Sequence, residues 1–116
     1  MASRPSCTSL PRIVSFDAQQ SVLRVTGEED RSTSGKRRRP ISAALKAECD
    51  VNVDLSELRL ADKSLMLDLA VLAQRLRADG CEMRLRRPQP YIRTLISVAG
   101  LDRLPSVEVV PRLARA

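Results

Sequence analysis

The sequence predicts an α/β protein in which a mixed, largely parallel β-sheet packs against α-helices. Three observations support this prediction: β-type runs alternate with helical runs, one helical run carries a regular leucine stripe, and Gly or Pro closes several of the runs. The expected order of elements is β-β-α-β-α-β-α-β. At 116 residues the chain suits one domain.

Two β-type runs open the predicted domain, "RIVSF" at residues 12–16 and "SVLRVTG" at residues 21–27. In the second run Leu23 and Val25 fall on one face and polar residues alternate with them, which is the period of a half-buried strand. We expect Gly27 to end this strand.

A short helix is expected next, over residues 40–48. Pro40 suits the first turn of a helix, where its missing N–H is not needed, and Ile41, Ala44 and Leu45 follow at helical spacing. The basic run at residues 36–39 directly precedes this helix, and we interpret it as solvated surface.

The clearest helix is expected over residues 63–78, after a strand at residues 50–58. Its leucines fall at i, i+4, i+7 and i+11 and form a stripe suited to packing on a sheet. They are Leu65, Leu69, Leu72 and Leu76. Gly80 supplies the stop. Met66 and Ala70 lie on a flank of this helix, where they meet the closing helix, a partner or a second copy of the chain.

Three more elements complete the expected order. The alternating run at residues 81–87 predicts a strand, with Cys81 and Met83 pointing inward. Residues 89–100 predict a short amphipathic helix that a glycine closes, and residues 106–110 predict a last strand.

The net charge of +6 raises the question of nucleic-acid binding, and its distribution argues against it. Residues 50–110 carry nine basic and nine acidic side chains, so the excess lies in residues 1–49 and in residues 111–116. Phe16 and Tyr91 are the two aromatic residues, too few for a surface that stacks on bases. We therefore expect no nucleic-acid partner.

Most catalytic and metal sites need residue types that this chain lacks. It has no histidine, and Cys7, Cys49 and Cys81 are too few and too widely spaced for a zinc site or a disulfide framework. No glycine-rich phosphate motif or nucleophile elbow occurs. We expect no enzyme, no metal and no cofactor.

No apolar run in the sequence is long enough for a transmembrane helix, which takes roughly 18 residues or more. The N-terminal segment also lacks the apolar run of a secretory signal. A cytoplasmic protein without direct membrane insertion is the expectation.

Two segments lie between a predicted strand and a predicted helix: "TGEEDRST", which contains Asp30 and Thr33, and "LADKSLML", which contains Asp62. In open α/β sheets, ligands and partners dock at such junctions. The same residue types are also good helix caps. Residue chemistry alone leaves capping and binding open at both junctions.

The sequence resembles STAS domains, the fold of bacterial anti-sigma factor antagonists. "VTGEEDRST" is similar to the family segment V-x-G-E-L-D-x-x-T, and "VNVDLSELRLADKSLMLDLAVLAQRLRADGCEMRL" is similar to the strand and helix around D-S-[ST]-G-L. "PQPYIRTLISVAGLDRL" is similar to the closing helix, P-x-x-x-x-x-x-L-x-x-x-G-L-x-x-L. The resemblance implies a STAS-type mixed β-sheet packed against α-helices over residues 12–110, with residues 1–11 as a flexible lead-in and residues 111–116 as a short basic tail.

The resemblance also implies a protein-binding regulatory module. Regulated family members bind an anti-sigma factor that is also a Ser/Thr kinase of the GHKL type, and so free a sigma factor for transcription. The kinase phosphorylates the residue after the motif Asp, and the added negative charge abolishes binding. The implied partner-binding residues are Asp30, Thr33, Asp62, Lys63, Ser64, Leu65 and Met66.

This chain departs from the family pattern at the acceptor position. Asp62 matches the motif Asp, but Lys63 follows it and has no hydroxyl to accept phosphate. Ser64 occupies the second motif position, Leu65 stands where the family has Gly, and Glu29 replaces the usual Leu of the first motif.

Three interpretations stay open. The first is an antagonist that is not switched by phosphorylation at the usual position. The second moves the switch to Ser64, a weak candidate because its side chain points about 100° round the helix from position 63. The third is a STAS subunit or assembly module of a membrane transporter. A homodimer stays open in all three.

Overall fold

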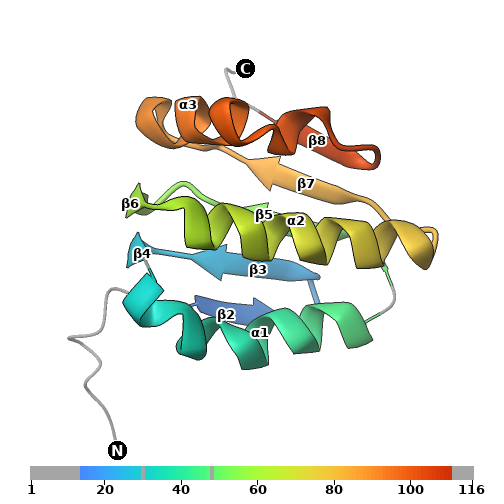
Figure 1. Ribbon diagram of the computed structural model, residues 1–116. Helices are drawn as coiled ribbons and strands as arrows, with labels where there is room; N and C mark the ends of the chain where they lie inside the picture. Colours follow the sequence, from blue (N-terminus) through green and yellow to red (C-terminus); the bar gives the residue numbers. More distant parts are fainter. Residues whose placement is uncertain (1–13, 30, 48, 111–116) are drawn as a thin grey trace, which may run out of the picture.

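The computed structural model describes residues 14–29, 31–47 and 49–110, which form a five-stranded sheet with three helices on one face (Figure 1). The strand order is β2-β3-β5-β7-β8. The strands are β2 (Val14–Asp17), β3 (Val22–Val25), β5 (Val51–Asp54), β7 (Met83–Arg86) and β8 (Val107–Val110). β2 and β3 pair antiparallel and the other neighbours pair parallel, which confirms the predicted mixed, largely parallel sheet.

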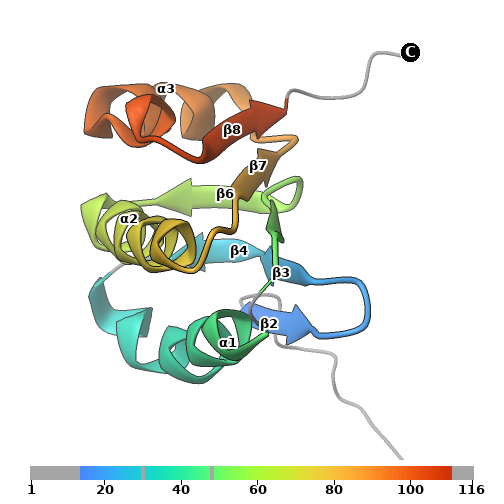
Figure 2. The same ribbon diagram turned by 90° about the vertical axis from the view of Figure 1, so that its right-hand side faces the viewer.

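The helices are α1 (Ser34–Lys46), α2 (Lys63–Ala78) and α3 (Pro90–Ala99), with short 3₁₀ turns η1 (Arg31–Thr33) and η2 (Leu101–Arg103). Figure 2 shows all three helices on the same side of the sheet, and α2 packs between α1 and α3. No helix of the described residues lies on the other face of the sheet. The expected order of long elements is confirmed.

The core is aliphatic and lies between the sheet and the helices. All four leucines of the predicted α2 stripe are fully buried: Leu65, Leu69, Leu72 and Leu76. Leu23 and Val25 of β3 are buried as the alternation predicts, while Arg24 between them is exposed. Gly80 follows α2 with a φ of +78°, a conformation open to glycine at little cost.

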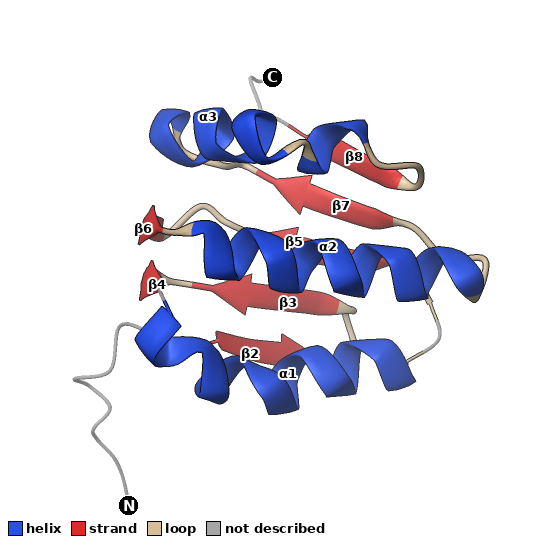
Figure 3. Ribbon diagram, viewed as in Figure 1, coloured by secondary structure: helices blue, strands red, loops and turns tan. Residues whose placement is uncertain are grey.

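Two very short strands were not expected from the sequence. β4 (Gly27–Glu29) and β6 (Leu58–Ala61) form a separate parallel pair at one end of the main sheet (Figure 3). The predicted strand over 50–58 is too long: β5 ends at Asp54, a turn follows, and β6 begins at Leu58. Gly27 has a φ of +76° and a register irregularity follows it, so the chain bends between β3 and β4 there.

The predicted start of the first helix is wrong. α1 begins at Ser34, six residues before Pro40, which lies inside the helix. Proline costs one intrahelical hydrogen bond at that position. The basic run consequently belongs to α1, and its side chains point to different sides of a helix.

The strand face without helices is polar and charged. Four carboxylates on or beside it lie within 3.4 to 3.6 Å of an arginine nitrogen. They are Asp50, Asp54, Glu82 and Glu108, and their arginine partners are Arg24, Arg84 and Arg87. Many of the charged side chains on this face are therefore paired with an opposite charge.

Candidate functional site

The pairing of β4 with β6 brings the two strand-to-helix junctions side by side. Its register aligns Glu29 with Ala61, the last residues of the two strands. After β4 the polypeptide passes through η1 to Thr33, the N-cap of α1. After β6 it passes directly to Asp62, the N-cap of α2. The site therefore depends on the two strands that the sequence did not predict.

Asp62 caps α2 through its side chain. Its Oδ1 accepts a hydrogen bond of 2.8 Å from the backbone N–H of Ser64 and one of 2.6 Å from the Ser64 hydroxyl. An aspartate here satisfies an unpaired N–H of the first turn and carries a charge that the helix N-terminus favours. The capping interpretation of Asp62 is confirmed.

Arg37 is the residue that joins the two junctions. Its guanidinium lies 2.9 Å from Oδ2 of Asp68, donates to Oγ1 of Thr33 at 3.2 Å and donates to the hydroxyl oxygen of Ser64 at 3.2 Å. The side chain is only 1% exposed. A buried guanidinium needs such partners because burying an uncompensated charge is costly.

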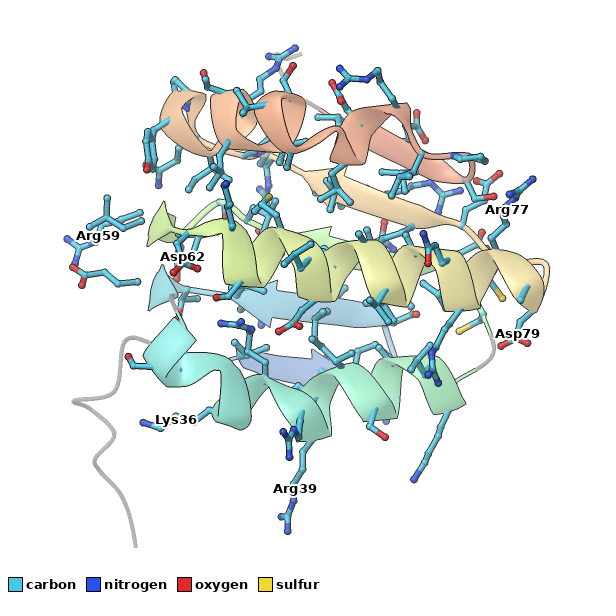
Figure 4. All side chains as sticks on the ribbon, in the orientation of Figure 1. Lys36, Arg39, Arg59, Asp62, Arg77 and Asp79 are labelled. Carbon is cyan, nitrogen blue, oxygen red and sulfur yellow. The ribbon has the colours of Figure 1, made fainter. Side chains whose placement is uncertain are left out.

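Arg37 was missed because it sits in the basic run that we interpreted as solvated surface. That interpretation is wrong for Arg37 and agrees with the exposure of Lys36, Arg38 and Arg39. Figure 4 shows Arg39 pointing away from α2. The signal available in the sequence is the i, i+4 spacing of Thr33 and Arg37, which becomes meaningful once α1 is known to begin before Pro40.

The other residues of the predicted partner-binding set divide into surface and core. Lys63 is exposed and Ser64 is half-buried. Leu65 and Met66 are 0% and 2% exposed and belong to the core, so neither is available to a partner in this conformation. Asp30 lies outside the described residues.

The Ser64 hydroxyl is part of the hydrogen-bond network at the junction. The Ser64 hydroxyl donates to Asp62 and accepts from Arg37, so its position is fixed by both neighbours. Within the described ranges no group of three His, Cys, Asp or Glu side chains could hold a metal ion. A membrane-spanning helix is also not found among those residues.

Comparison with known proteins identifies the fold family. The family model described as "Mlab, STAS domain" matches residues 13–111, which is most of the chain. The chain belongs to the STAS domain family. STAS domains related to the anti-sigma factor antagonists are generally regulatory modules without catalytic activity.

Solved STAS structures share this fold at low sequence identity. A protein from Thermotoga maritima, assigned to the anti-sigma factor antagonists, superposes with a TM-score of 0.69 at 12% identity, covering 87% of this chain and 88% of its own. The anti-sigma factor antagonist SpoIIAA in its unphosphorylated form gives 0.63 at 22% identity, covering 78% and 79%. The Bacillus cell-fate determinant SpoIIAA in its phosphorylated form gives 0.58 at 22%, covering 78% and 82%. No curated protein sequence matches the chain.

Proposed function

We propose that this STAS domain is an antagonist-like binding module that engages an anti-sigma factor of the Ser/Thr kinase type and so frees a sigma factor. The proposal rests on the resemblance of its junction motifs to those of anti-sigma factor antagonists, and it places the docking surface at Thr33, Asp62, Lys63 and Ser64. It extends to Asp30, which precedes Thr33 in the same motif. The module acts in the cytoplasm, where its partner and the sigma factor reside.

The single observation that carries the regulatory part of the proposal is the exposed Lys63 at the first residue of α2. An ammonium group can neither accept phosphate as a hydroxyl does nor imitate phosphate, because its charge has the opposite sign. The module is therefore not switched off by phosphorylation at this position, and it stays competent to bind while the kinase is active.

Ser64 is a poor replacement for the missing acceptor. Its hydroxyl is held between the Asp62 carboxylate and the buried Arg37 guanidinium. Transfer of phosphate to it requires both hydrogen bonds to break and brings a dianion next to the Asp62 carboxylate, which like-charge repulsion opposes.

The test is capture of the partner from native cytosol, followed by incubation with ATP and Mg²⁺ and an intact mass of the wild-type protein. We expect a captured kinase and no mass gain, whereas Lys63→Ser gains one phosphate on the new serine. Ser64→Ala is the matched control, because it removes the remaining hydroxyl and leaves Lys63 in place. A phosphate that maps to Ser64 in the wild type contradicts the proposal.

A second candidate is a STAS subunit or assembly module of a membrane transporter. Lys63 favours it too, since an assembly part needs no acceptor hydroxyl. Capture of a transporter component in place of a kinase would support this candidate. The contact surface would be the same junction.

A further inference from the structure

A groove runs between α1 and α2, beside the junction, and the buried Arg37 is part of its lining. Its volume is about 350 Å³. Three apolar residues line it, Ile41 and Leu45 from α1 and Val71 from α2, together with Arg37, Arg38, Ser42 and Asp68. Ile41 and Leu45 are only partly buried against the core. The groove thus combines apolar side chains with the ion pair between Arg37 and Asp68, and Arg38 is exposed beside it.

The outward face of α2 continues this apolar surface. Lys63, Leu67 and Val71 follow one another at i, i+4 and i+8, so they lie along one side of the helix. Leu67 is 66% exposed and Val71 is 51% exposed. No element of the described part of the chain covers them, although α2 as a whole is apolar enough to be buried on more than one side.

The two helices that border the groove hold the net charge of the whole chain. α1 and α2 together contain eight basic residues and one acidic residue, a net charge of +7 against +6 for all 116 residues. The one acidic residue is Asp68, and Arg37 binds it. Within the lining Arg37 and Asp68 offset each other, so Arg38 leaves the groove with a net positive charge beside its apolar side chains.

We propose that this groove receives an amphipathic helix of the partner, with apolar side chains on Leu67, Val71 and Ile41 and acidic side chains facing Arg38 and Lys63. This proposal rests on the proposed function and names the chemistry of the partner. Apolar anchors inside a charged rim are the usual composition of a helix-in-groove contact.

Charge and composition decide against the other occupants. A second copy presents the same cationic helices, so a symmetric contact through this face sets like charges against each other. A nucleic acid matches the charge and leaves the exposed Leu67 and Val71 without partners, since phosphate contacts come from basic and polar groups.

The experiment uses synthetic helical peptides and the isotope-labelled full-length protein. One peptide carries leucines along one face and glutamates elsewhere, a second has lysines in place of the glutamates, and a third has the composition of the first with its leucines scattered. Chemical-shift titrations give the affinity and the residues that contact each peptide. We expect only the first peptide to bind, with shifts confined to α1, α2 and the junction.

Two matched pairs of variants locate the contact. Arg38→Gln is compared with Arg39→Gln, because the two arginines are neighbours and Arg39 points away from α2 (Figure 4). Leu67→Asp is compared with Val98→Asp, since Val98 is 75% exposed but lies on α3. We expect Leu67→Asp to lower the affinity for the acidic peptide about tenfold or more and Arg38→Gln to lower it less. Both control variants should bind the peptide with wild-type affinity.

Several results overturn the proposal. They are equal binding of the acidic and basic peptides, equal effects of the paired variants, a dimer in sedimentation that Leu67→Asp dissociates, and duplex DNA binding that outcompetes the acidic peptide. If the acidic peptide binds at the groove but no kinase is ever captured, the groove proposal is supported and the proposed function is contradicted. If a kinase is captured and Leu67→Asp leaves its affinity unchanged, the proposed function is supported and the groove proposal is contradicted.

Discussion

The two sides of the sheet carry charge in different ways. On the face without helices, Arg84 alone lies within 3.4 to 3.5 Å of three carboxylates, and Asp54 lies close to two arginines. On the helical side, α1 and α2 carry a large excess of cations, and exposed apolar residues lie among them.

The number of charged side chains on a surface therefore indicates less about partner binding than whether those side chains already form ion pairs within the protein. The strand face is as rich in arginine as α1 is, but its arginines have carboxylates to bind, and water can solvate the whole network. The side formed by α1 and α2 has neither enough carboxylates nor a fully polar surface, so a partner of complementary charge gains more there.

The largest effect is expected from Arg37, the one cation of α1 that is buried. Arg37→Ala should lower the free energy of unfolding by about 3 kcal/mol, because it leaves unfilled volume and removes the donor to Thr33, Ser64 and Asp68. Arg39→Ala, from the same run, should change it by less than about 0.5 kcal/mol. Urea denaturation of both variants measures this, and equal losses would mean that Arg37 is not a structural bridge.

Asp54 tests the paired face through its pKa. Burial by itself raises the pKa of Asp54, but hydrogen bonds from the N–H and O–H of Ser56, with Arg87 and Arg24 nearby, outweigh burial and hold this pKa below its ordinary value of 3.8. The ionised carboxylate therefore stabilises the fold at pH values above 3.8, and this stabilisation is lost as the pH falls through the lower folded value.

We accordingly expect Asp54→Asn to lower the free energy of unfolding by about 1 kcal/mol at neutral pH. The gap between the wild type and the variant should narrow in acid. Denaturation curves at a series of pH values measure it. A gap that stays constant with pH would show that the charge of Asp54 contributes nothing.

Asp62 at the junction should give an effect of similar size on stability and a larger one on binding. Asp62→Ala removes the cap of α2 and the acceptor for Ser64, at a cost of about 1 kcal/mol. Asp62→Asn is the matched variant, since it keeps a capping oxygen and removes the charge. If the asparagine variant restores stability but not partner affinity, the charge itself serves binding.

The smallest effect is expected from Arg84 on the strand face. Its side chain is 31% exposed and its carboxylate partners are more exposed still, so water screens the pairs. Arg84→Gln should change the free energy of unfolding by less than about 0.5 kcal/mol, and added salt should shrink that change further. A loss above 1 kcal/mol would contradict the view that this face is simply solvated.

The parts of the fold that the sequence predicted are those with strong local signals. The α2 helix matches its predicted bounds because Asp62 caps it, leucines line one side and Gly80 ends it. The predicted start of α1 was wrong because Pro40, a good first-turn residue, lies inside the helix. The helical residues before it are Ser, Gly and basic residues. The basic residues favour a helix there, whereas Gly35 and Pro40 disfavour it, and the contact of Arg37 with Asp68 adds to the balance.

The sequence named some residues of the junction and missed how the junction is assembled. Thr33, Asp62 and Ser64 do come together, and the links between them are β4 with β6 and the buried Arg37. Strands of three and four residues are too short to show a period, and an arginine inside a basic run looks like its neighbours. The pairing of β4 with β6 exists only in the folded chain, and the spacing of Thr33 and Arg37 gains meaning only when the start of α1 is known.

The order of strands decides where a tether is harmless. β2 and β8 are the two edges of the sheet, with α1 packed over β2 and β3 at one edge and α3 beside β8 at the other (Figure 1). A fluorescent reporter or surface anchor joined after Val110 therefore leaves the chain on the side remote from α1. Sensors and immobilised forms of the protein should be attached at that end, where they leave access to the α1 and α2 surface open.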